Sequence, residues 1–185
     1  MSEKKEHLFP MERAGWLDIG IRRWLQNPAK IIKPHIKDGM TALDVGCGTG
    51  YFTLEMARMV GKSGRVIAAD LQDGMLQIVS TKIKGTELED RIVLHKCGEN
   101  KIGVTGPVDF VLLFYMVHEV LNADDLFKEI ESILKPNGQV LFVEPSDHVS
   151  KSAFEESLRK AIDAGLVQAG RQNVFFSRSV VLKKG

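Results

Sequence analysis

One ten-residue run limits what this chain can fold into more than any other feature. In the run from Thr41 to Gly50, TALDVGCGTG, closely spaced apolar residues precede three glycines at alternate positions. The apolar half is typical of the end of a short buried strand, because it lacks helical spacing. Glycine has no Cβ and tolerates positive φ, so the second half permits a sharp turn and close approach of a ligand. A helix pattern follows at once, with apolar residues at 54, 56, 57 and 60.

The order of strand, glycine loop and helix is typical of open α/β sheets, which bind ligands beyond the carboxyl ends of their strands. Two kinds of nucleotide-like ligand are compatible with a glycine loop of this type. A dinucleotide fingerprint requires its third glycine three residues after the second. Tyr51 occupies that position. This residue argues against a nicotinamide-dependent oxidoreductase, which is the main enzymatic alternative.

The stretch from Leu43 to Gly50 resembles motif I of the class I S-adenosylmethionine-dependent methyltransferases, including the acidic Asp44 two places before the first glycine. Two further segments, Tyr115 to Val120 and the LKPNG turn from Leu134 to Gly138, resemble the ubiquinone/menaquinone-biosynthesis (methyltransferase type 11) branch. The resemblance implies an α/β fold of three layers, Rossmann-like, with a mostly parallel seven-stranded sheet and a C-terminal antiparallel hairpin.

The hydrophobic patterns along the chain agree with this class. Strand patterns at 65–70, 92–94, 109–114 and 139–144 alternate with helix patterns, and two further strand patterns at 166–169 and 174–182 flank a turn. We therefore expect five parallel strands alternating with helices, followed by a hairpin, with crossovers of the usual right hand.

Asp70 ends the second strand pattern, twenty residues beyond Gly50. A carboxylate at the end of the second strand of a βαβ unit is placed to accept hydrogen bonds from both ribose hydroxyls of an adenosyl group. The alternative role is a helix cap, but Asp73 is the better cap and would leave Asp70 free. Leu71 and Met75 are then expected to flank the adenosine.

The resemblance implies that S-adenosyl-L-methionine is the cofactor and S-adenosyl-L-homocysteine the product. After the third strand these methyltransferases usually carry an aspartate that meets the adenine amine, whereas this chain has Cys97-Gly98-Glu99. Adenine is then expected to be held by backbone groups at Gly98 or by Glu99. The predicted cofactor-binding residues are Asp44, Gly46, Cys47, Gly48, Gly50, Asp70, Leu71, Met75, Cys97, Gly98, Glu99, Leu113 and Phe114.

Three titratable residues follow the last two parallel strands and are candidate catalytic bases. His118 and Glu119 follow the fourth strand and Glu144 ends the fifth, so both loops open at the sheet edge where the transferred methyl group is expected. A histidine or a partly desolvated glutamate can remove a proton from an acceptor hydroxyl, amine or acidic carbon. The alternative is structural, with Glu144 binding loop backbone. Asp147 and His148 beside Glu144 weakly suggest a metal site, but such loop residues are usually solvated, and no metal is expected.

Composition excludes several classes of function. A formal net charge of +1 over 185 residues gives no broad positive field for nucleic acid. The longest apolar run, from Phe110 to Val117, is far shorter than the roughly 20 residues of a membrane helix. The charged N-terminus lacks the apolar core of a secretion signal, and two cysteines do not make a disulfide framework. A cytoplasmic location is expected.

We expect one globular unit in which residues 1–35 form an N-terminal helical lid or extension and residues 36–185 form the S-adenosylmethionine-binding methyltransferase domain. The lid rests on a helix pattern with Trp16 and Trp24, followed by a short helix that starts at Asn27-Pro28; a plain packing helix is the alternative. The predicted function is methyl transfer to a small-molecule acceptor, with a homodimer left open as the assembly. A non-catalytic S-adenosylmethionine-binding subunit is the alternative from another class.

Overall fold

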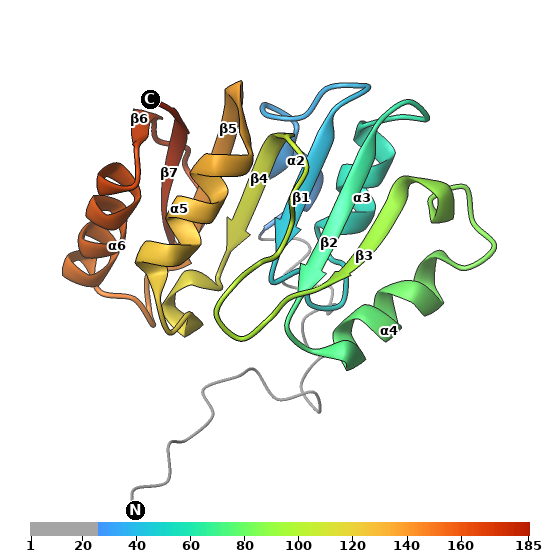
Figure 1. The fold of residues 1–185 in the computed structure, drawn as a ribbon, viewed down its shortest axis with the longest axis horizontal. Coiled ribbons are helices and arrows are strands. Elements are labelled where there is room, and N and C mark those ends of the chain that lie inside the picture. The colour runs from blue at the N-terminus through green and yellow to red at the C-terminus, as the bar shows by residue number, and fades with distance from the viewer. Residues whose placement is uncertain (1–25) are drawn as a thin grey trace, which may run out of the picture.

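The structure, a computed structural model, describes residues 26–185. Its described part contains one seven-stranded sheet in the order β3-β2-β1-β4-β5-β7-β6, with helices against both faces (Figure 1). The predicted α/β fold with a mostly parallel sheet and an antiparallel C-terminal end is thereby confirmed. The predicted helix around Trp16 and Trp24 lies outside the described residues.

The parallel strands are β1 (Thr41–Val45), β2 (Arg65–Asp70), β3 (Ile92–Lys96), β4 (Val108–Phe114) and β5 (Leu134–Pro145). The hairpin strands are β6 (Leu166–Gly170) and β7 (Ser177–Lys184), and β7 runs antiparallel to both β5 and β6. The helices are α2 (Pro28–Ile32), α3 (Thr53–Met59), α4 (Asp73–Ile83), α5 (Ala123–Ile133) and α6 (Lys151–Asp163), with short 3₁₀ helices η2 (Glu89–Arg91) and η3 (Val117–Glu119). The short helix expected at Asn27-Pro28 is α2, and the Asn27 side chain caps it.

Two cores lie on opposite faces of the sheet, because successive strand residues point to opposite sides. Leu43 and Val45 of β1 pack with apolar residues of α5 and α6, whereas Ala42 packs with those of α2, α3 and α4. Figure 1 shows α5 and α6 in front of the sheet and α3 behind it. Strands buried on both faces read as continuous apolar runs, which is the pattern that β4 shows from Phe110 to Phe114.

The expected alternation of strands and helices is wrong at one crossover. Residues 97–107 connect β3 to β4 without a helix. Three glycines and a proline fall in this stretch, at 98, 103, 106 and 107, and these residues disfavour a continuous helix. The open connection leaves one face of the sheet near β3 uncovered by a crossover helix, and residues from its start line the cavity described below.

The LKPNG turn interrupts β5 near its start. Val108 of β4 pairs with Leu134, but Phe110 pairs with Gln139, so the residues between Leu134 and Gln139 bulge out of the ladder. Beyond the bulge, β5 pairs with β4 on one side and β7 on the other up to its end. The carboxyl ends of β4 and β5 therefore lie side by side. Among the described residues, no helix is long and apolar enough to cross a membrane.

Candidate active site

A cavity of about 1540 Å³ opens at the carboxyl ends of the parallel strands. Pockets for a single ligand usually have about 300–1,000 Å³, so this one has room for two molecules side by side. The predicted site residues that line it are Asp44, Gly46, Cys47, Gly48, Asp70, Leu71, Met75, Cys97, Gly98, Glu99, Phe114, His118 and Glu119. Gly50, Leu113 and Glu144 are not part of the lining: Leu113 lies in the core, and a Cβ on Gly50 would lie 3.0 Å from Val79 of α4.

The glycine loop turns under the carboxyl end of β2. Gly46 and Gly48 have φ of 69° and 52°, a left-handed conformation that favours glycine. The backbone N–H groups of Gly46 and Cys47 both donate to the carbonyl of Ala69, at 2.8 and 3.0 Å. A Cβ on Gly48 would meet no atom of residues 26–185 within 4 Å, although the residue lines the cavity. A side chain at position 48 would therefore occupy part of the cavity, which glycine leaves open.

Asp70 at the end of β2 holds this loop in place. One carboxylate oxygen accepts the Gly48 N–H at 2.9 Å, and the other accepts the Gln72 N–H at 2.8 Å. Burial raises the pKa of Asp70, while these backbone hydrogen bonds and the Lys96 charge oppose the increase. The expectation that Asp73 caps α4 and leaves Asp70 free is wrong: Gln72 is the N-cap, and Asp73 pairs with Lys96 at 2.8 Å.

Asp70 still lines the cavity. Each of its carboxylate oxygens has a second acceptor position, so both can accept a further hydrogen bond from a ligand. Asp44 at the end of β1 lies in the same wall, buried, and accepts a hydrogen bond from the Thr53 hydroxyl at 2.6 Å. Burial raises the pKa of Asp44 to about 7, and the charge of Asp70 adds to the increase. Two neighbouring buried carboxylates favour a cationic ligand, whose charge stabilises both ionised forms.

The segment after β3 places both expected adenine-binding groups at the cavity. The Gly98 N–H donates to the Lys101 carbonyl at 3.0 Å, so this donor is engaged, but Gly98 and Glu99 both line the cavity, and contact of either with adenine stays a prediction. Burial raises the pKa of the Cys97 thiol to about 12 and also raises that of Cys47. Because the thiolate is the reactive form, burial disfavours a nucleophilic role for either cysteine near neutral pH.

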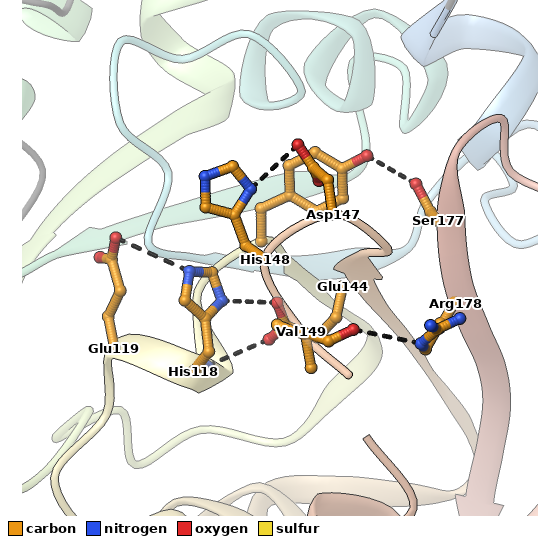
Figure 2. A network of polar contacts seen from close by, with 9 residues as sticks. His118, Glu119, Glu144, Asp147, His148, Val149, Ser177 and Arg178 are labelled. Atoms are coloured by element: carbon orange, nitrogen blue, oxygen red, sulfur yellow. Dashed lines mark hydrogen bonds and ion pairs between the residues drawn. The ribbon is translucent and has the colours of Figure 1, made fainter. Parts of the chain in front are cut away.

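His118 and Glu144 meet at the other end of the cavity (Figure 2). Nδ1 of His118 lies 2.6 Å from Oε2 of Glu144, and the His118 backbone N–H donates to Oε1 at 3.1 Å. Glu144 is 1% exposed and lies behind His118, outside the cavity lining. The hydrogen bond to Glu144 raises the pKa of His118. Glu119 is more distant, with Oε1 4.0 Å from Nε2 of His118.

The sequence analysis missed an apolar wall that reaches this end of the cavity from the β6–β7 loop. Phe175 and Phe176 of that loop line the cavity together with Leu121, which is 85% exposed. Phe176 has φ of 50° and is 73% exposed. Both phenylalanines fall in the strand pattern predicted at 174–182, whereas β7 begins only at Ser177, and their place beside the end of β5 depends on contacts between distant segments.

Gln26 also bridges the cavity between its two ends. The Tyr51 hydroxyl donates to the Gln26 carbonyl at 3.0 Å, and the Gln26 side chain donates to the Phe175 carbonyl at 3.2 Å and to the Tyr115 hydroxyl. Gln26 is the first residue that the structure describes, and it belongs to the predicted lid, residues 1–35. This residue of the predicted lid therefore lines the cavity. Within residues 26–185, no three His, Cys, Asp or Glu side chains are grouped so that they could hold a metal ion.

Comparison with known proteins identifies the family of this site. A family model described as a methyltransferase domain matches residues 36–173. The chain belongs to this methyltransferase domain family. The expected class of methyltransferase, similar to the menaquinone-biosynthesis enzymes, is confirmed by this match together with the relatives below.

The methyltransferase domain is similar to two demethylmenaquinone methyltransferases. The protein of Lactobacillus johnsonii is 37% identical over 127 residues, which are 66% of this chain and 52% of that protein. The protein of Bacillus subtilis is 29% identical over 125 residues, which are 68% of this chain and 53% of that protein. The alignments thus span about half the length of these relatives.

Among solved structures, the fold resembles a SAM-dependent methyltransferase from Aquifex aeolicus with a TM-score of 0.83 and 26% identity, over 96% of this chain and 100% of that chain. A geranyl diphosphate C-methyltransferase from Streptomyces coelicolor has a TM-score of 0.69 and 14% identity, over 86% of this chain and 79% of that chain. The second likeness concerns the fold alone.

Proposed function

We propose that this chain is an S-adenosylmethionine-dependent methyltransferase that acts on a small-molecule acceptor. The observation that carries the proposal is one cavity with a glycine loop and two buried carboxylates at one end and a histidine at the other. When bound, S-adenosylmethionine supplies an electrophilic methyl group on a positively charged sulfur. Family membership and the Aquifex neighbour support this choice, and the nicotinamide-dependent oxidoreductase is not favoured.

In this proposal Asp70 accepts hydrogen bonds from the ribose hydroxyls on its remaining lone pairs, and Leu71 and Met75 flank the adenosine. Asp44 offsets the positive charge of the cofactor, which explains why a carboxylate with a raised pKa lies against the glycine loop. Gly46, Gly48 and Cys47 provide close backbone approach, Phe114, Cys97, Gly98 and Glu99 complete the wall, and Gly50 and Leu113 act through packing alone.

The acceptor end supports an acceptor with an apolar body. Leu121, Phe175 and Phe176 expose apolar surface to the cavity, whereas His118 and Glu119 are its titratable residues on the η3 side. The relatives are named for demethylmenaquinone, an acceptor with this character. Because the chain spans about half of those proteins, the reduced form of demethylmenaquinone serves here as a probe acceptor. A cytoplasmic location, a homodimer, the absence of a nucleic-acid partner and a domain boundary at residue 35 remain predictions; light scattering tests the assembly state.

The first test of this function is Asp70→Ala. S-adenosylhomocysteine is expected to bind about 10- to 100-fold more weakly by calorimetry, because hydrogen bonds to a charged acceptor contribute about 1.5–3 kcal/mol. Asp73→Ala is the matched control, since it removes a carboxylate three residues away that pairs with Lys96 and does not line the cavity. The control is expected to bind like the unaltered protein.

A ligand comparison separates a ribose contact from a disturbed loop, because Asp70 also holds the Gly48 N–H. The unaltered protein is expected to prefer S-adenosylhomocysteine over its 2′-deoxyribose analogue, and Asp70→Ala is expected to lose most of that preference. An undiminished preference in the variant removes Asp70 from the ribose site. If the unaltered protein binds the cofactor but transfers no methyl group to any acceptor, the non-catalytic subunit is the better assignment.

A further inference from the structure

Glu144 is a buried carboxylate that accepts two hydrogen bonds within residues 26–185, both from His118. Oε2 lies 2.6 Å from Nδ1 of His118, and Oε1 accepts the His118 backbone N–H at 3.1 Å. Arg178 pairs with Glu144 in the β5–β7 register, but its Nε donates to the Val149 carbonyl at 3.2 Å instead (Figure 2). Because a buried charge is costly unless it is paired and hydrogen-bonded, Glu144 and His118 form one unit.

This pairing decides where the proton of the imidazole lies. An ionised carboxylate only accepts hydrogen bonds, so Nδ1 of His118 carries the hydrogen that Glu144 accepts. In the neutral ring, Nε2 is then the unprotonated nitrogen. His118 lines the cavity with 31% of its side chain exposed, while its partner is buried behind it. Nε2, with its free lone pair, thus lies on the side of the ring that points away from Glu144.

We propose that His118 is the catalytic base of the methyl transfer and that Glu144 is a positioning residue that fixes its Nδ1–H form. The inference rests on the proposed function. In the balanced step, an electron pair of the acceptor atom forms the bond to the methyl carbon while the carbon–sulfur bond breaks towards sulfur. The proton of the acceptor atom passes to Nε2. The resulting imidazolium lies against the Glu144 charge and later releases its proton to water.

The charges around His118 determine the sign of the pH dependence. Glu144 faces it from β5, Glu119 from η3, and Arg178 lies beyond Glu144 on β7. Asp147 and His148 follow β5 and pair with each other at 3.0 Å, both largely exposed. The hydrogen bond to Glu144 raises the pKa of His118, burial opposes the increase, and the charges of Glu144 and Glu119 add to it. The neutral, basic form is therefore lost as the pH falls through this raised pKa.

The first experiment needs no acceptor. In the full chain saturated with S-adenosylhomocysteine, nitrogen NMR of His118 is expected to show the Nδ1–H form and a titration above the ordinary value of about 6.5. In Glu144→Gln, which keeps the shape and an acceptor oxygen but not the charge, the titration is expected to move to lower pH. A neutral ring protonated on Nε2, or an unchanged titration in Glu144→Gln, overturns the proposal.

The second experiment measures turnover with the reduced demethylmenaquinone probe. His118→Gln is expected to lower kcat by about 10²- to 10⁴-fold, the usual contribution of a general base, with S-adenosylhomocysteine affinity within about threefold. In Glu144→Gln the acid limb of the kcat/KM profile is expected to move to lower pH, which loss of a merely structural contact does not cause. His95→Gln is the control, because His95 lies on β3 outside the cavity lining and bonds the Ile102 carbonyl at 2.7 Å.

Full activity of His118→Gln at neutral pH, or an unmoved acid limb in Glu144→Gln, overturns the assignment and leaves alignment of the reactants as the source of catalysis. Failure of the proposed function has a different signature. In that case the unaltered protein neither binds S-adenosylhomocysteine nor transfers a methyl group, and the same NMR titration on the ligand-free chain judges the His118–Glu144 pair.

Discussion

The two ends of the cavity are built in different ways. The cofactor end comes mainly from one stretch, residues 44–75, in which Asp70 accepts the N–H of Gly48 only 22 residues earlier. The acceptor end combines the segments after β4 and β5, the loop before β7, and Gln26, whose side chain bonds Phe175 across 149 residues. A site for a common cofactor is therefore local in the sequence, whereas the site for a particular acceptor depends on the assembled sheet.

The chemistry of the two ends differs as well. At the cofactor end, backbone N–H groups and two buried carboxylates leave little freedom for substitution. At the acceptor end, exposed apolar side chains provide area without directed hydrogen bonds, and Tyr115 and Phe176 have positive φ of 60° and 50°. Left-handed backbone at such residues costs on the order of 1–3 kcal/mol each and clusters at functional sites. The acceptor end is thus where sequence change alters specificity with least harm to the fold.

The largest effect is expected at Gly48. Valine at this position has a branched Cβ that projects into the cavity and requires φ of 52°, so S-adenosylhomocysteine is expected to bind about 100-fold more weakly or not at all. Gly85→Val is the matched control, because Gly85 has φ of 70° and also no atom of the described residues within 4 Å of its Cβ position, but lies outside the lining. Equal loss of binding in both variants would mean that backbone strain, and not the filled cavity, is responsible.

A smaller effect is expected from Asp44→Asn, and it concerns stability. The folded-state pKa of Asp44 is raised from 3.8 to about 7, so its contribution is favourable at low pH and is lost as the pH rises through about 7. At about pH 8 the ligand-free variant is expected to be more stable by about 2–4 kcal/mol, and the difference is expected to be less than half as large at about pH 5. Thermal unfolding at both pH values measures this.

Asp44→Asn is also expected to bind the cofactor more weakly, because it removes a buried negative charge that attracts a cationic ligand. Asp109→Asn is the control for the stability measurement: Asp109 accepts from Lys135 at 2.7 Å, so this variant loses a favourable ion pair. Equal stability of Asp44→Asn and the unaltered protein at about pH 8 would show that the ionised Asp44 carboxylate does not destabilise the fold. The two ends of the cavity would then not differ in their electrostatics as described above.

The smallest effect is expected at the acceptor end. Phe176→Asn removes the ring but keeps a residue that tolerates left-handed backbone. The KM of the probe acceptor is expected to rise about 3- to 10-fold, which corresponds to about 1 kcal/mol of lost apolar contact, and S-adenosylhomocysteine affinity is expected to stay unchanged. Ile162→Asn removes an exposed apolar side chain from α6, away from the cavity, and should alter neither value. A loss of cofactor affinity in Phe176→Asn would show that the ends are not independent.

The sequence by itself determined the sheet and the cofactor end of the cavity. Buried strands read as apolar runs, and glycines with left-handed backbone follow β1 as three alternate residues, so both patterns are visible without coordinates. The acid at the end of β2 also follows from spacing within one βαβ unit. These features are local, and local geometry depends on the residue types themselves.

Only the tertiary structure decided which partners the polar residues take. Glu144 and His118 are 26 residues apart and are both candidate bases by position, but burial of one behind the other divides them into a positioning residue and a base candidate. Likewise, Phe175 and Phe176 reach the cavity because β7 pairs antiparallel with β5 and returns their loop to its end. Burial and pairing between distant segments depend on how the strands are ordered in the sheet, and hydrophobic periodicity along the chain does not encode that order residue by residue.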